Sequence, residues 1–443
     1  MTKSEPATSG GDPRHTDVGS VFVSNYPPYS FWGAEQVSRV REALGDPARP
    51  DTPLGLYLHV PFCRKRCKFC YFKVYTEKNS QDVARYLAAV AREAALFAGQ
   101  PAVGGRPLKF VYVGGGTPSF ISAKHLRELV SRLRDALAWD GAEEITFECE
   151  PGTLTQPKLE TIREVGVTRL SLGVENFDDR ILEENGRAHL SKEIYRVAPW
   201  IRALAFDQLN IDLIAGMVGE TFETWRETVR KTVEMDPDSV TIYQMELPFN
   251  TVYSRRMLDG EDAVPVADWA TKRAWHDYAF SRLEAAGYEL SSAYTMVKRG
   301  SPVRFVYRDS VWHGCDLLGL GVASFSHVSG VHFQNEDAWE PYLTRLESGE
   351  LPVARAFATS AGERLTRELI LQLKLGRLEP RYFREKFEVD VLSAFAGAFE
   401  RLEHRKMLTV RDGAVHLTRQ GLLRVDTLLP EFYDAKYHGA RYT

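Results

Sequence analysis

The sequence lacks the features that mark secreted, membrane-spanning and nucleic-acid-binding proteins. Its 443 residues include only five cysteines, two of which, Cys149 and Cys315, stand alone in apolar surroundings and predict buried thiols rather than disulfides. No run of about 18 apolar residues occurs, so we expect no membrane span. The formal net charge of −4 gives no overall attraction to nucleic acid. Residues 1–20 lack the apolar stretch of a secretion signal and predict a flexible polar leader. These absences favour a cytoplasmic protein.

What the sequence does contain is the composition of an ordinary globular protein. Hydrophobic residues make up 44% of the chain and charged residues 26%. The length suffices for one large core and a smaller additional domain.

Short apolar runs alternate with longer amphipathic segments. The continuous apolar character of the runs is typical of strands that are buried on both faces of a parallel sheet. Six strand–helix units in series favour an α/β fold built on a partial (β/α)6 barrel of the TIM type, with an open doubly wound sheet as the alternative. The expected strands cover 56–62, 108–116, 144–150, 169–175, 208–216 and 239–247, and the helices include 81–98, 123–138 and 266–286.

The pattern changes near residue 355. Helical stretches at 361–375 and 391–404 precede two short strands over 408–418, joined through Asp412 and Gly413. This order is typical of a small winged-helix-like domain, which we expect to pack on the barrel rather than to bind DNA. The expected divisions are a leader over 1–20, an extension covering the barrel over 21–50, the barrel over 51–350 and the C-terminal domain over 355–443.

The three remaining cysteines lie within eight positions, in the stretch LYLHVPFCRKRCKFCYF. Cys63, Cys67 and Cys70 have the spacing C-x3-C-x2-C on a short loop after the first strand. A zinc site needs a fourth ligand, and the direction of nearby His59 is set by its strand. A [4Fe–4S] cluster is the stronger interpretation, and three protein ligands leave one iron open to bind a cofactor.

This motif resembles the signature of the radical S-adenosylmethionine (SAM) superfamily. The surrounding YLHVPFC…C.FC and later motifs resemble more narrowly the oxygen-independent coproporphyrinogen III oxidase family, from about Tyr26 into the C-terminal domain. The resemblance implies that the open iron binds the amino and carboxylate groups of SAM, and that one electron then cleaves SAM to a 5′-deoxyadenosyl radical. It makes Cys63, Cys67 and Cys70 the cluster ligands and the centre of catalysis.

Two later motifs indicate ligand contacts through the chemistry of their residues, without the family resemblance. GGGTP at 114–118 follows the second strand, where glycines let the backbone approach a ligand. FECEPG places Glu148 and Glu150 on one face of the third strand, and a carboxylate at the C-terminal end of a barrel strand is typical of a ligand contact, with a salt-bridged pair as the alternative.

The resemblance extends to a set of SAM contacts. Glu175 stands where the family usually carries Gln, and Asp212 matches a contact to ribose or to a second SAM molecule. The implied cofactor-binding residues are Tyr57, Phe69, Gly115, Gly116, Thr117, Glu148, Glu175, Arg187, Asp212, Met245 and Phe325.

Three activities compete within this resemblance. The first is oxidative decarboxylation of coproporphyrinogen III, or another porphyrin or haem reaction. Its members carry a further cysteine where Phe72 stands here, although VSNYPPYSFW at 23–32 resembles the segment with which they cover the active site. The second is a non-catalytic haem chaperone, whose relatives carry a histidine where Tyr307 stands.

The third activity resembles that of class C radical SAM methylases and their cyclopropane-forming relatives, which lack the extra cysteine and bind two SAM molecules. The sequence analysis favours this methyltransferase or cyclopropanation chemistry on an sp² carbon. The enzymatic interpretations imply a small-molecule unsaturated or aromatic substrate, and a reducing partner such as flavodoxin or ferredoxin.

Overall fold

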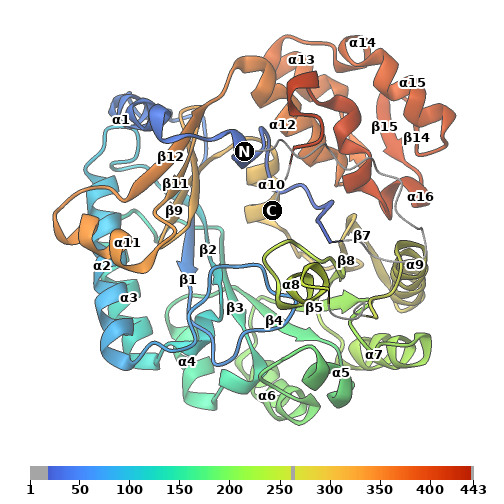
Figure 1. The fold of residues 1–443 in the computed structure, drawn as a ribbon, viewed down its shortest axis with the longest axis horizontal. Coiled ribbons are helices and arrows are strands. Elements are labelled where there is room, and N and C mark those ends of the chain that lie inside the picture. Colours follow the sequence, from blue (N-terminus) through green and yellow to red (C-terminus); the bar gives the residue numbers. More distant parts are fainter. Residues whose placement is uncertain (1–17, 261–264, 441–443) are drawn as a thin grey trace.

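The protein consists of one large curved sheet with helices along its outer face and a smaller helical region at the C-terminus (Figure 1). The computed structural model describes residues 18–260 and 265–440. The leader expected over residues 1–20 therefore lies outside the described residues, apart from its last three positions.

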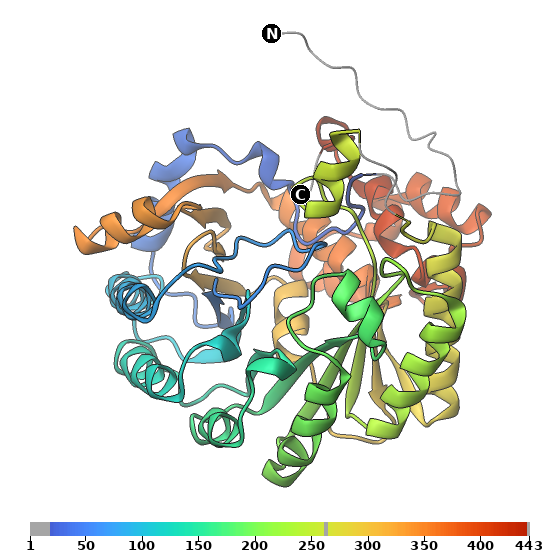
Figure 2. The ribbon, with the colours of Figure 1, turned by 60° about the horizontal axis from the view of Figure 1, so that its bottom comes forward.

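Six parallel strands form the centre of the sheet, each followed by at least one helix. Figure 2 shows the helices in a row along the outer face of these strands. The α/β barrel-type fold predicted from the six apolar runs is confirmed. The strands are β1 (Leu54–Val60), β2 (Leu108–Gly115), β3 (Glu144–Cys149), β4 (Arg169–Glu175), β5 (Gln208–Ala215) and β6 (Ser239–Gln244). The connecting helices are α2 (Ser80–Ala98), α3 (Ala123–Ala136), α4 (Gln156–Glu164), α5 (Asp179–Glu184), α6 (Ser191–Leu204) and α7 (Phe222–Met235).

The sheet continues past both edges of the parallel strands. Its order is β12-β11-β10-β9-β1-β2-β3-β4-β5-β6-β8-β7, in which β9 is parallel to β1 and the outer strands are antiparallel. The sequence showed this part only as irregular strands near 316–326. The added strands are β7 (Tyr288–Ser292), β8 (Thr295–Lys298), β9 (Asp316–Leu320), β10 (Phe325–Val328), β11 (Val331–Asn335) and β12 (Val353–Ala358). Helices α1 (Val37–Gly45), α8 (Val252–Leu258), α9 (Trp269–Ala285), α10 (Val306–Trp312) and α11 (Trp339–Glu347) lie among them.

The C-terminal region combines helices with a three-stranded sheet. Asp412 and Gly413 both have positive φ, 53° and 74°, as expected for a tight two-residue hairpin turn. The single helix expected over 391–404 is wrong, because the chain breaks at Phe395 into two helices. The elements are α12 (Ala361–Leu373), β13 (Arg377–Leu378), α13 (Pro380–Phe387), α14 (Val391–Ala394), α15 (Ala396–His404), β14 (Leu408–Arg411), β15 (Ala414–Leu417) and α16 (Arg419–Leu422).

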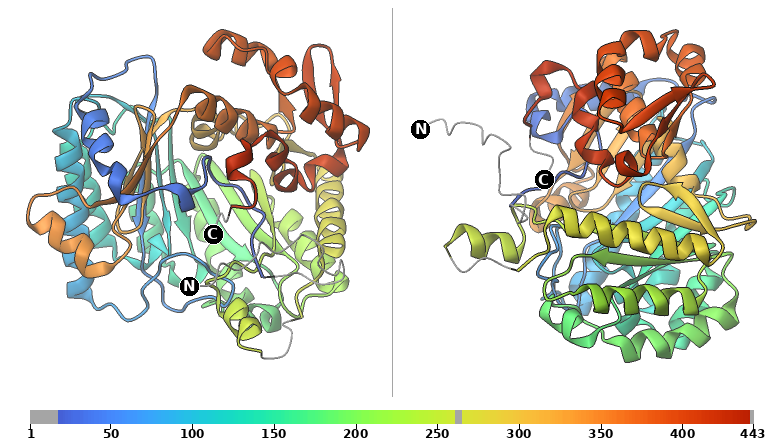
Figure 3. Two further views of the ribbon diagram at one scale, coloured as in Figure 1. Left: turned by 45° about the horizontal axis from the view of Figure 1, so that its top comes forward. Right: turned by 90° about the vertical axis from the view of Figure 1, so that its right-hand side faces the viewer.

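Residues 18–32, which we call the N-terminal strap, cross from the C-terminal region towards α1 (Figure 3, left). The buried Lys374 ammonium lies 2.7 Å from the Asp426 carboxylate and also donates to the backbone oxygen of Val23. The Val23 N–H donates to Asp426 at 2.9 Å. The strap is therefore fastened by charges that belong to the other end of the chain.

Among the described residues, no helix is both long enough and apolar enough to cross a bilayer.

Candidate active site

The three clustered cysteines lie on the loop that connects β1 to α2. Hydrogen bonds close the base of this loop, from the Cys63 N–H to the Tyr75 oxygen at 3.0 Å and from the Tyr75 N–H to the Pro61 oxygen at 2.7 Å. All five cysteines of the chain are free thiols. The loop is thus a closed turn that carries three unpaired sulfur atoms.

The surroundings of these sulfurs fit a group bound by several thiolates. Burial, together with a smaller effect of the nearby Cys67 sulfur, raises the pKa of Cys63 to about 11 and that of Cys70 to about 12. Two donors point at the sulfurs, the Thr117 hydroxyl at 3.3 Å from Cys63 and the Arg187 guanidinium at 3.4 Å from Cys67. Among the described residues, no three His, Cys, Asp or Glu side chains surround a single metal ion. Cysteine thiolates are the usual ligands of iron–sulfur clusters, and this loop carries three of them.

The interior of the barrel carries a ring of partly exposed side chains at one level. Each central strand is otherwise largely buried and contributes at least one such residue. The Tyr57 and Tyr112 rings stack at 6.0 Å, and the Tyr112 hydroxyl donates to Glu148 at 2.7 Å. The ring consists of Tyr57, Tyr112, Glu148, Gly173, Asp212 and Tyr243.

Three carboxylates lie within mutual electrostatic reach in this interior. Burial raises the pKa of Glu148 and of Glu175 to about 7, and that of Asp212 is also raised by burial. The Arg187 guanidinium lies 3.6 Å from Glu175 and opposes this rise. Glu175 also has a φ of 63°, an unusual conformation for a residue with a side chain. We call Glu148, Glu175 and Asp212 the carboxylate triad. It suits a positively charged ligand.

The GGGTP segment packs directly against the cysteine loop. Gly115 has a φ of 118°, and its N–H donates to Glu148 at 3.1 Å. A Cβ at Gly116 would lie 3.0 Å from the Cys63 sulfur. The Gly116 and Thr117 N–H groups donate to backbone oxygens of the β1 end and the cysteine loop. The glycines therefore allow a close approach, but these three N–H groups already have partners inside the protein.

Three predicted cofactor contacts are more peripheral. The Met245 side chain is 2% exposed and lies in a small apolar cluster against which Phe69 packs. Phe325 is 37% exposed, and its ring lies 5.4 Å from that of Tyr29 and 5.5 Å from that of Trp32 on the N-terminal strap.

Glu148 and Glu150 have different hydrogen-bond partners. Strand β3 ends at Cys149, and the Glu150 carboxylate lies 2.8 Å from the His189 ring and accepts from the Gly152 N–H at 2.9 Å. Glu150 thus follows the alternative of a buried salt-bridged residue, whereas Glu148 faces the barrel interior.

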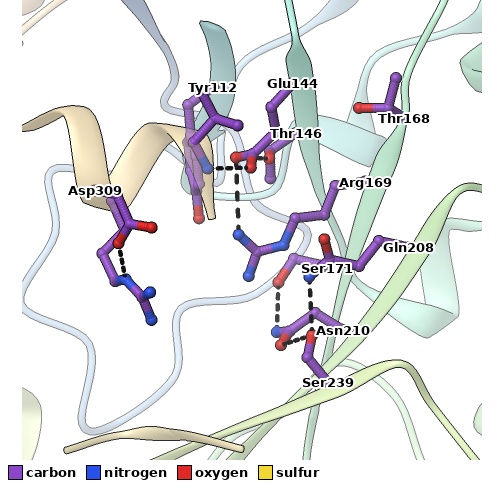
Figure 4. Close-up of polar contacts among 12 residues, drawn as sticks. Tyr112, Glu144, Thr146, Thr168, Arg169, Ser171, Gln208, Asn210, Ser239 and Asp309 are labelled. Atoms are coloured by element: carbon purple, nitrogen blue, oxygen red, sulfur yellow. Dashed lines mark hydrogen bonds and ion pairs between the residues drawn. The ribbon is translucent and has the colours of Figure 1, made fainter. Parts of the chain in front are cut away.

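The opposite end of the barrel holds a network of neutral side chains beside the buried pair of Arg169 and Glu144, 3.8 Å apart (Figure 4). Gln208 donates to Ser239, Ser239 donates to Asn210, and Asn210 donates to Ser171. Ser171 donates to Asp212 at 2.7 Å. The network therefore positions one member of the carboxylate triad from below.

A cavity of about 320 Å³ also lies at this end, away from the cysteines. Its lining includes Lys109, Glu143, Phe305 and Arg308. Because the cysteine loop follows the C-terminal end of β1, this cavity is not the site that the sequence predicts.

Comparisons with known proteins agree with the fold and with the cysteine motif. The radical SAM superfamily pattern matches residues 57–232. The chain is 30% identical to a haem chaperone, HemW, of Mycobacterium tuberculosis over 328 residues, covering 74% of this chain and 83% of the relative. It is 28% identical to an oxygen-independent coproporphyrinogen III oxidase of Synechocystis sp. over 444 residues, covering 95% and 92%.

The chain belongs to the radical SAM superfamily, in the coproporphyrinogen III oxidase-like family. The solved structure of coproporphyrinogen III oxidase from Escherichia coli has the same fold, with a TM-score of 0.80 at 22% identity over 93% of this chain and 96% of that one. Membership of the superfamily implies a [4Fe–4S] cluster and SAM as cofactors.

The methyltransferase or cyclopropanation activity favoured from the sequence is wrong. That interpretation depended on the absence of a cysteine at Phe72. The full-length relatives are coproporphyrinogen III oxidases and haem chaperones, so the alternatives stated with it fit better. The residue at position 72 alone did not identify the reaction. The likeness to the oxidases extends over nearly the whole chain and outweighs this one difference.

The sequence missed several residues of the site. Tyr112 and Tyr243 belong to the ring in the barrel interior, and His189 pairs with Glu150. The tyrosines could have been found from strand alternation, since each occupies an inward position near the C-terminal end of its strand. No local signal marks His189.

Proposed function

We propose that the protein is a radical SAM enzyme that oxidatively decarboxylates a coproporphyrinogen-like substrate. The observation that carries the proposal is the extent of the likeness. The match to the Synechocystis oxidase covers 95% of this chain, whereas those to the haem chaperones of Bacillus subtilis and Mycobacterium tuberculosis cover 83% and 74%.

The cysteine loop supplies the first part of the activity. Cys63, Cys67 and Cys70 would hold the cluster, while Thr117 and Arg187 donate to two of their sulfurs. When bound, the cluster supplies one electron that cleaves SAM to a hydrogen-abstracting radical. A decarboxylation that removes CO₂, one hydrogen atom and one electron requires such a radical and a final electron acceptor.

The carboxylate triad supplies the second part. Glu148, Glu175 and Asp212 would attract the cationic SAM into the barrel, with the stacked rings of Tyr57 and Tyr112 beside it. Phe69 and Met245 would bound the site from their shared apolar cluster. Gly115 and Gly116 would leave room for the backbone to approach the cofactor.

Exposed aromatic side chains at the same end would contact the pyrrole rings of the substrate. Phe72 is 45% exposed, and its ring stacks on that of Tyr71 at 4.5 Å. Phe325 packs on Tyr29 of the N-terminal strap. Aromatic faces of this kind suit a large unsaturated ring system. The strap would exclude water from the reacting carbon.

The test is anaerobic reconstitution with iron and sulfide, followed by reaction with SAM, dithionite and coproporphyrinogen III. The expected result is 5′-deoxyadenosine together with a substrate that has lost CO₂, both identified by mass spectrometry. Stoichiometric haem binding without any cleavage of SAM would contradict the proposal and favour a carrier. Equilibrium dialysis of the reconstituted protein with labelled SAM tests the expectation that each chain binds two SAM molecules. Binding of a single SAM molecule per chain would contradict that expectation.

A further inference from the structure

The cysteine loop presents an unusual concentration of positive charge on its outer surface. Arg64 and Lys65 follow the first cysteine and are exposed, and Arg66 and Lys68 flank the partly exposed Cys67. The protein as a whole carries a formal charge of −4, so this local excess is not a property of its average surface.

Helix α8 adds further positive charge beside this loop. The N–H groups of Val252 and Tyr253 donate to the Lys68 oxygen at 3.0 and 3.3 Å, and the Asn250 side chain donates to the Tyr71 oxygen at 2.7 Å. The helix stands out from the body of the protein (Figure 3, right). Its exposed Arg255 and Arg256 therefore extend the cationic surface of the loop.

We call these six side chains the basic patch. Of the six, Lys68 pairs with Glu184 at 3.1 Å. For Arg64, Lys65, Arg66 and Arg255, no carboxylate among the described residues lies within ion-pair distance. The members are Arg64, Lys65, Arg66, Lys68, Arg255 and Arg256.

The patch lies close to the predicted cluster ligands. The pKa of the Tyr253 hydroxyl is raised by burial and by nearby Cys67, and lowered by Arg256, so this residue is near both the patch and the sulfur. The Arg66 guanidinium donates to the Cys70 oxygen at 3.2 Å. A protein bound to the patch would thus contact the cysteine loop itself.

We propose that the basic patch is the docking surface for an acidic one-electron carrier protein, which reduces the cluster before SAM cleavage. This inference rests on the proposed function, because only an enzyme that cleaves SAM reductively needs an electron at its cluster. One electron would pass from the carrier's reduced prosthetic group to the cluster, so that the carrier is oxidised by one electron and the cluster is reduced by one electron. Opposite charges raise the rate of encounter between the two proteins, most strongly at low ionic strength.

The test measures the bleaching of the reconstituted cluster by a reduced acidic flavodoxin in a stopped-flow spectrometer. The double variant Lys65→Glu/Arg255→Glu is expected to lower the second-order rate constant at least tenfold at low salt. This difference should shrink towards unity in concentrated salt. The matched control is Lys124→Glu on α3, an exposed residue whose reversal should leave the rate unchanged.

Two further measurements separate the possible failures. Iron content and the extent of bleaching by excess dithionite should be equal in the double variant and the unmodified protein. Equal rates with flavodoxin at low salt would overturn the docking surface. The docking surface would also be overturned if the double variant lost affinity for single-stranded RNA while its reduction rate with flavodoxin stayed unchanged. That result would assign the patch to a nucleic acid. A cluster that dithionite cannot reduce would instead overturn the proposed function.

Discussion

The two ends of the parallel barrel strands differ in how their polar groups are balanced. At the N-terminal ends, Asn210 and its neighbours are neutral groups that hydrogen-bond to one another. At the C-terminal ends, the Arg187 guanidinium lies 3.6 Å from Glu175, and Arg169 lowers the pKa of both Glu148 and Asp212 from further away, so two cations face three carboxylates. Buried charge that is not balanced within the protein is typical of a site prepared for a ligand. The comparison teaches that the fold is stabilised at one end and prepared for chemistry at the other.

The largest effect should follow loss of a sulfur at the C-terminal end. In Cys67→Ala the iron content after reconstitution is expected to fall to background, and SAM cleavage with it, because two thiolates cannot hold the cluster. The matched control is Cys149→Ala, a buried thiol outside the loop. Normal iron content in Cys67→Ala would contradict the assignment of the ligands.

The next largest effect concerns the cation that opposes the triad. Arg187→Met is expected to destabilise the protein by about 3 kcal/mol at pH 8, because removing one partner of a buried pair leaves the other charge uncompensated. The loss should be smaller at pH 6. Without Arg187 the folded pKa of Glu175 rises further above its unfolded value, so stability is lost as the pH rises through that range. Urea unfolding at both pH values measures this, with Arg187→Lys as the charge-preserving control.

A substitution at the other end should affect stability without removing the cluster. Asn210→Ala is expected to cost about 2 kcal/mol, because it leaves the Ser239 and Thr241 hydroxyls without their buried acceptor. Urea unfolding measures the change, and iron content is expected to remain normal. A loss of iron in this variant would show that the two ends are not separable.

The smallest predicted effect is a pH dependence of cofactor affinity. The pKa values of Glu148 and Glu175 are both raised to about 7, so both become ionised as the pH rises from 6 to 8. The dissociation constant of the sulfonium cation SAM should therefore fall about tenfold over this range. Isothermal titration checks this, and S-adenosylhomocysteine, which lacks the sulfonium charge, should show a weaker dependence. Equal dependences for the two ligands would contradict the role of the triad.

The sequence predicted the centre of the fold closely, because each parallel strand is a continuous apolar run. The predicted and observed limits of β4 are both 169–175, and those of β2 differ by one residue. It did not predict the antiparallel extensions around β10 or the helix break at Phe395, since these depend on pairing and packing between distant segments. The same limit applies to the site. The cysteine motif is local and was recognised, whereas the burial of Arg187 follows only from the folded chain.

The fastening of the N-terminal strap has a consequence for biosynthesis. Val23 is held by Lys374 and Asp426, residues that leave the ribosome more than 340 positions later. Since domains generally begin to fold while the chain is still being made, the barrel can form before the strap can dock. Translation therefore leaves an interval in which the central strands have been made and the strap is not yet fastened.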